Sequence, residues 1–97
     1  MFRHIVLFRF KDDADPARIT EVLDGLEELP QRIGAIRSYT VRRDAEVSDG
    51  TYDACIVAGF DDAEGFLSYR DHPLHVEHAK EQLGPLIAER AAIQVTD

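Results

Sequence analysis

The sequence predicts an α+β domain with the element order β-α-β-β-α-β, in which an antiparallel four-stranded sheet carries its helices on one face. Three observations lead to this prediction. Four short runs are rich in β-branched, aromatic and other apolar residues, as strands are. Two longer stretches repeat apolar residues at helical spacing. No repeat or linker divides the 97 residues, a length that suits one domain, so we expect residues 1–97 to form a single domain.

The first half of the chain contains a strand, a helix and a second strand. Residues 3–10 have β-branched and aromatic side chains and are apolar on both faces, which predicts the first strand. Asp15 followed by Pro16 is typical of a helix start, an N-cap and then a proline at the first helical position. Pro30 ends this helix. After a turn, alternation over residues 36–43 predicts the second strand.

The second half contains a strand, an interrupted helix and a last strand. Residues 52–60 are apolar at nearly every position, which is typical of a central strand covered on both faces. Residues 61–64 open a helix that is interrupted at Pro73, because proline disfavours helix at the residue before it. The helix resumes over 74–83, and residues 88–96 suit a last strand.

This order is that of the ferredoxin-like fold, whose helices cover only one face of the sheet. The strands predicted over 3–10 and 52–60 are apolar on both faces, so the second face also needs cover. A second copy of the chain can supply it around a two-fold axis. We therefore expect a homodimer that joins its sheet faces. A monomer with a tolerated apolar face is the alternative.

Composition excludes several functional classes. The net charge is −8, with 19 acidic against 11 basic residues, which argues against a nucleic-acid or anionic membrane surface. No apolar run approaches the roughly 20 residues of a membrane span, and no signal peptide precedes the first strand. We expect a cytoplasmic protein whose natural start is Met1. The one cysteine, Cys55, allows no intrachain disulfide and is expected to be a small buried apolar residue.

The candidate chemistry lies around the helix break, where Tyr69, His72, His75 and His78 recur at every third position. Tyr69 and His72 are expected on the apolar side, His75 at its rim and His78 toward solvent. A histidine at such a rim titrates near neutral pH and can act as a general acid or base. A tyrosine can hydrogen-bond to and orient a carbonyl. The alternative to a catalytic role is that these histidines only cap backbone groups at the helix break.

His4 is a further candidate, because its strand face places it at the rim of the buried layer. The alternative is a strand-end histidine that bonds a neighbour or water. Three histidines can also bind zinc, but Pro73 separates His72 from the other two, and we expect no metal. The chain has no phosphate-binding glycine loop, dinucleotide fingerprint or nucleophile elbow, so we expect no cofactor.

With these residues the chain resembles the stress-responsive A/B barrel domain (Dabb) family over essentially its whole length. The matching segments are 3–11, 36–39, 52–54 and 69–76, the last of which reads Tyr-x-x-His-Pro-x-His. The resemblance implies a dimeric α/β barrel in which two sheets pack face to face. It also implies chemistry, because a plant polyketide cyclase of this family closes a linear chain by aldol condensation without a cofactor.

The site residues of that cyclase can be carried over by position. Its catalytic tyrosine corresponds to Tyr69 and its catalytic histidine to His75. A strand histidine near its pocket corresponds to His4, and the first histidine of the motif to His72. The cyclase has bulky aromatic residues on its first helix, where this chain has aliphatic ones, so the substrate is not carried over.

Three functions remain open from the sequence. The first is a cofactor-independent cyclase or isomerase acting on a small polyketide-like or carbonyl substrate, with His75 as base, Tyr69 polarising a carbonyl, and His4 or His72 assisting. The second is a non-catalytic stress-response dimer that binds a small ligand or a partner. The third is a ferredoxin-like monooxygenase.

Overall fold

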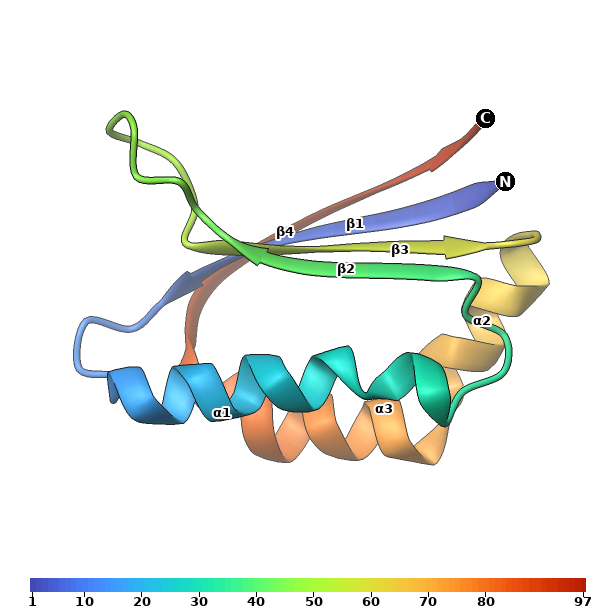
Figure 1. Cartoon of the computed structure of the whole chain (residues 1–97), viewed down its shortest axis with the longest axis horizontal. Helices are drawn as coiled ribbons and strands as arrows, with labels where there is room; N and C mark the ends of the chain where they lie inside the picture. Colours follow the sequence, from blue (N-terminus) through green and yellow to red (C-terminus); the bar gives the residue numbers. More distant parts are fainter.

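The structure, a computed structural model, describes all 97 residues and consists of an antiparallel sheet with its helices on one face (Figure 1). The strands lie in the order β2-β3-β1-β4. Their bounds are β1 Phe2–Phe10, β2 Ser38–Arg43, β3 Ala54–Phe60 and β4 Ile87–Thr96. The helices are α1 Pro16–Glu27, α2 Ala63–Asp71 and α3 Pro73–Glu77. This is the ferredoxin-like α+β fold that the sequence predicted.

The strand ladders explain where predicted and observed strands differ. In the β2–β3 ladder, Ser38 pairs with Gly59 and Arg43 pairs with Ala54. The second and third strands therefore begin two residues later than predicted, because the paired register ends at these positions. β4 begins at Ile87, one residue earlier than predicted, and pairs with β1 over nearly its whole length.

The helix starts and the helix break follow the predicted signals. The Asp15 carboxylate accepts a hydrogen bond from the backbone N–H of Ala17 at 3.1 Å and caps α1. His72 has extended backbone angles, which end α2 and separate it from α3. The segment after the break, expected as one helix over 74–83, is α-helical only to Glu77 and continues as a π-helical turn over His78–Leu83.

The core lies between the helices and one face of the sheet. On β1, His4, Val6 and Phe8 are buried, whereas Ile5 and Leu7 on the opposite face are only half-buried. Figure 1 shows no helix over that opposite face. We call it the open sheet face. It also carries Ile93, Val95 and Cys55, and Cys55 is therefore half-buried instead of fully buried as expected.

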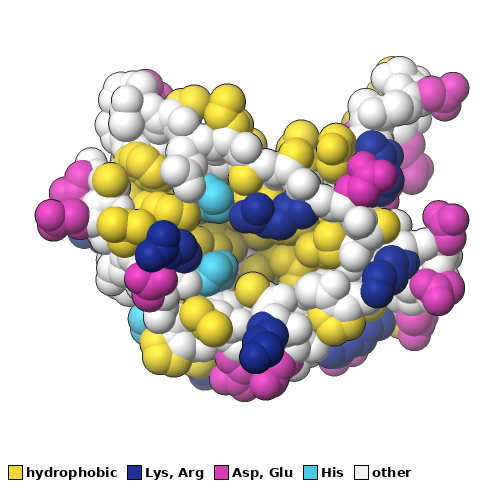
Figure 2. Space-filling view, turned by 180° about the vertical axis from the view of Figure 1, so that it is seen from behind, with side chains coloured by type: hydrophobic (Ala, Val, Ile, Leu, Met, Phe, Trp, Pro, Cys, Tyr) yellow, Lys and Arg dark blue, Asp and Glu magenta, His cyan; other side chains and the backbone are white.

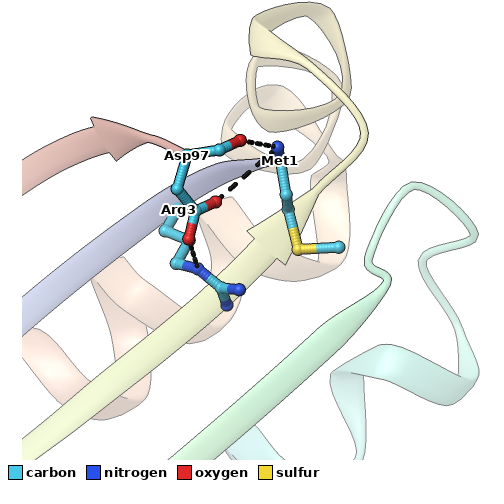
Figure 3. A network of polar contacts seen from close by, with 3 residues as sticks. All are labelled: Met1, Arg3 and Asp97. Carbon is cyan, nitrogen blue, oxygen red and sulfur yellow. Dashed lines mark hydrogen bonds and ion pairs between the residues drawn. The ribbon is translucent and has the colours of Figure 1, made fainter.

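The pairing of β1 with β4 brings the two ends of the chain together. The Met1 ammonium donates a hydrogen bond to the backbone oxygen of Asp97 at 2.6 Å, and Arg3 Nε donates to the Asp97 carboxylate at 3.1 Å (Figure 3). These contacts hold the outer strand against β1 at one edge of the sheet. Separately, none of the helices combines the length and apolar character that crossing a membrane requires.

Candidate functional site

A cavity of about 340 Å³ lies between the sheet and the interrupted helix. Its size falls within the range of small-molecule sites. Nine of its 14 lining residues are hydrophobic. The other side chains that matter here are His4, Arg70, His75, Arg90 and Gln94, and the buried Tyr69 lies beside them. Figure 2 shows histidine and basic side chains gathered around a hollow with hydrophobic side chains inside it.

Three of the four predicted site residues line this one cavity. Tyr69 comes from the last turns of α2, His75 from α3 and His4 from β1. The rings of Tyr69 and His75 lie 4.2 Å apart between centroids, inclined by 39°. The ring of His4 lies 4.6 Å from that of Phe66, which shares the same apolar layer. The break at Pro73 turns α3 so that residues six apart along the chain meet.

The proton positions on His75 follow from its hydrogen bond. Its Nδ1 lies 3.0 Å from the backbone oxygen of Arg70. A carbonyl oxygen only accepts, so Nδ1–H donates and the neutral ring keeps its lone pair on Nε2. Burial lowers the pKa of His75, and the positive charge of Arg90 lowers it further, although the bond to Arg70 opposes both. His75 is therefore a neutral base near pH 7.

His4 has the complementary arrangement. Its Nδ1 lies 3.2 Å from Nε2 of Gln94. An amide nitrogen only donates, so His4 Nδ1 accepts and the neutral ring carries its proton on Nε2. Burial lowers the pKa of His4, with smaller contributions from Arg90 and His75. The cavity thus combines a histidine with a free ring acceptor and a histidine with a free ring donor.

The hydroxyl of Tyr69 has a partner that the sequence did not suggest. Tyr39 on β2 places its hydroxyl 3.0 Å from that of Tyr69. Burial raises the pKa of both phenols, so both keep their protons at neutral pH. One hydroxyl donates to the other, which leaves one proton of the pair for a further acceptor. The sequence feature that could have indicated a buried Tyr39 is its position two residues before Val41, which places both on one strand face, and Val41 is buried.

His72 and His78 lie outside the cavity. His72 Nδ1 accepts a hydrogen bond from the backbone N–H of Leu74 at 3.1 Å and caps α3. The prediction that His78 points to solvent is wrong, because the ring is half-buried against α1, where it lies beside Gly25. No group of three or more His, Cys, Asp or Glu side chains, and so no trio of His72, His75 and His78, is placed to hold a metal ion.

Arg90 and Gln94 are cavity residues that the sequence prediction missed. The β1–β4 register pairs Gln94 with His4 and Arg90 with Phe8. Cross-strand partners point to the same face of a sheet, so both side chains project toward the helices. The available signal was that Arg90 and Gln94 alternate with Ala91 and Ile93 along the last predicted strand. Nothing in that alternation indicated which face the helices would cover.

Comparisons with known proteins agree with this architecture. The model of the stress responsive A/B barrel domain family matches residues 2–97. A stress-response A/B barrel domain-containing protein of Arabidopsis thaliana is 32% identical over 79 residues, which cover 78% of this chain and 68% of that protein.

Two solved structures have the same fold. A dimeric ferredoxin-like protein of unknown function from Thermobifida fusca has 34% identity and a TM-score of 0.90, over 99% of this chain and 90% of that one. A dimeric protein with a ferredoxin-like fold from Bacteroides fragilis has 27% identity and a TM-score of 0.84, over 99% of this chain and 95% of that one. Both similar proteins are dimers.

Proposed function

The chain belongs to the stress-responsive A/B barrel domain family, and from this premise we propose that it is a cofactor-independent enzyme that moves a proton next to a carbonyl group. The substrate is a small polyketide-like or other carbonyl compound bound in the cavity between sheet and helices. The observation that carries the proposal is the complementary protonation of His75 and His4 on the walls of one cavity.

The proposed reaction begins at His75. Its Nε2 lone pair takes a proton from a carbon next to the substrate carbonyl. The electron pair of that C–H bond forms the C=C bond of an enolate, and negative charge develops on the carbonyl oxygen. The hydroxyl of Tyr69 and the Nε2–H of His4 donate hydrogen bonds to this oxygen, and in this arrangement Tyr39, 3.0 Å away, is the donor to Tyr69.

Two outcomes follow from the same enolate. In an aldol closure, the enolate carbon attacks a second carbonyl of the same molecule, and the proton on His75 passes to the new alkoxide. In an isomerisation, the substrate carries a C=C bond next to the carbon that loses its proton, so the enolate is conjugated, and that proton returns to the γ-carbon as the C=C bond shifts toward the carbonyl. Both reactions balance without an oxidant, a reductant or a metal. Both need a neutral imidazole at the start, in agreement with the lowered pKa of His75.

The proposal includes assembly as a homodimer of single 97-residue domains through the open sheet face. Ile93 on this face is 59% exposed and Val95 37% exposed, and both lie beside the half-buried Ile5 and Leu7, so this face presents adjoining apolar side chains to water. The related protein from Thermobifida fusca is a dimer. A two-fold partner sheet would remove these side chains from water and form the expected barrel.

Deuterium exchange tests the proposed chemistry without requiring the natural substrate. The protein in D₂O is mixed with 4-oxo-4-phenylbutanoate, and NMR follows loss of the protons next to its ketone. We expect the protein to accelerate exchange, and His75→Ala to reduce the acceleration at least about 100-fold, as for loss of a general base. Tyr69→Phe should also slow exchange. His78→Ala, outside the cavity, should leave it unchanged.

An acceleration that survives in both His75→Ala and Tyr69→Phe would show that these roles are wrong. Binding of the ketone without any exchange would instead favour the non-catalytic ligand-binding dimer. That alternative has one observation in its favour, since the Nδ1 of His75 is already held by the protein backbone.

A further inference from the structure

Arg90 is a cation at the cavity that the proposed chemistry does not use. We infer that Arg90 binds a carboxylate of the substrate, so that the substrate class is an oxo acid with its ketone near Tyr69 and His75 and its carboxylate at β4. This inference rests on the proposed function, because it specifies the substrate class of the same cavity.

The first observation is that Arg90 has no partner within the chain. Most arginines form an ion pair with a carboxylate, and Arg43 donates to the hydroxyl of Thr20. Arg90 makes neither kind of contact, although acidic residues outnumber basic ones by 19 to 11. Arg32 is also unpaired, but it lies in a different groove, beside α1. Arg90 is thus the unpaired arginine of the cavity.

The second observation is the absence of acidic side chains from the cavity lining. The groove beside α1 is lined by Glu21, Glu28 and Glu77, as expected for a chain with a net charge of −8. The other arginine of the cavity, Arg70, is held by Asp71 through a contact of 2.8 Å between Nε and Oδ1. The cavity therefore has one uncompensated guanidinium, whose five N–H donors suit a carboxylate.

The third observation is the place of Arg90 along β4. The register sets Arg90 opposite Phe8, and Gln94 opposite His4, on the same face of the sheet. Arg90 and Gln94 are four positions apart, so their Cα atoms lie roughly 13 Å from each other along the strand, and the long arginine side chain bridges part of this distance. The surfaces between them are apolar and include Val6 and Ala92. A ligand with a short apolar body between ketone and carboxylate fits this arrangement.

The position of Arg90 also has an electrostatic consequence. Its positive charge contributes to lowering the pKa of both His4 and His75. A carboxylate bound to Arg90 would offset that charge and raise the pKa of His75, which makes the ring a stronger base once the substrate is present. The same contact would then both anchor the ligand and prepare the proton transfer.

A pair of matched probes tests the inference by titration calorimetry. The probes are 4-oxo-4-phenylbutanoate and its primary amide, which differ in charge and hardly in size. We expect the wild type to bind the acid at least about tenfold more tightly than the amide, as for a charge-assisted hydrogen bond. Arg90→Gln should abolish this preference by weakening only the acid. Arg32→Gln, which removes an unpaired arginine of the groove beside α1, should keep the preference.

Equal affinity for acid and amide, a preference that survives in Arg90→Gln, or no binding of either probe would overturn the carboxylate site. Failure of the proposed function has a different signature, because binding is measured without turnover. In that case the wild type would still bind the acid more tightly than the amide, and Arg90→Gln would still remove this difference. Deuterium exchange would be absent or insensitive to His75→Ala.

Discussion

The ring of His75 lies 4.2 Å from the ring of Tyr69, centroid to centroid, across the break between α2 and α3. The contact depends on His72, whose extended backbone ends α2 and whose ring caps α3. It also depends on Tyr39, which binds the far end of Tyr69 at 3.0 Å. The candidate site is therefore held by two residues that do not themselves line the cavity.

The two tyrosines should be energetically coupled. Removing either hydroxyl leaves the other phenol without its partner in a largely buried position, so the second removal should cost less than the first. In urea unfolding of Tyr39→Phe, Tyr69→Phe and the double variant, we expect a coupling energy of about 0.5–1.5 kcal/mol. Additive effects of the two substitutions would mean that the hydroxyls do not interact in solution.

His72 should stabilise the fold without taking part in ligand binding. His72→Ala removes the acceptor of the Leu74 N–H, and we expect the free energy of unfolding to fall by about 1 kcal/mol, as for loss of an N-cap. His72→Asn supplies another acceptor and should restore most of this loss. Affinity for 4-oxo-4-phenylbutanoate should be the same in all three proteins. A weaker affinity in both variants would instead assign His72 to the site.

Stability should fall as the pH drops below about 6.5, the ordinary pKa of histidine. Burial lowers the pKa of His4, His75 and His78 in the folded state. At a pH between the folded-state and unfolded-state pKa of these histidines, the unfolded chain binds more protons than the folded one, so acid favours unfolding. The free energy of unfolding therefore reaches its full value only above the pKa of the histidines in the unfolded chain. Urea midpoints at pH 7.5 and 5.5 measure this loss.

Replacing the three histidines gives the matched control for this pH dependence. A His4→Gln, His75→Gln and His78→Gln triple variant should show a smaller decrease of the urea midpoint between pH 7.5 and 5.5 than the wild type. An equal decrease in both proteins would assign the pH dependence to other groups.

The open sheet face should mediate dimerisation. In sedimentation equilibrium we expect the wild type at twice the chain mass of 10.9 kDa. Ile93→Glu places a charge on this face and should shift the protein to monomer. Leu67→Glu is the control, because Leu67 is 41% exposed on α2, on the other side of the sheet. A monomeric wild type, or an equal effect of both substitutions, would contradict the proposed interface.

The sequence predicted the fold well because each element has a local signal. Runs of β-branched, aromatic and other apolar residues marked the strands, Asp15 and Pro16 marked the start of α1, and Pro73 marked the helix break. Tyr69 and His75 were predicted together for the same reason, because they are close in the sequence and belong to one motif. These predictions needed no knowledge of which distant segments meet.

The parts of the site that were missed depend on contacts between distant segments. Tyr39 meets Tyr69 across 30 positions, and Gln94 meets His4 across 90. Such contacts follow from strand register, which periodicity within one segment does not specify. The wrong prediction for His78 has a related cause. Its side chain follows the proline break and begins the π-helical turn, where regular helical spacing no longer determines which face a side chain occupies.

The most direct test of the proposed site is the protonation of the two cavity histidines, measured by long-range ¹H–¹⁵N NMR at pH 7.5. We expect both rings to be neutral, His75 with its proton on Nδ1 and His4 with its proton on Nε2. His75→Ala and His4→Gln identify the two sets of signals. A proton on Nε2 of His75, or a charged His75 ring at this pH, would contradict its role as the base.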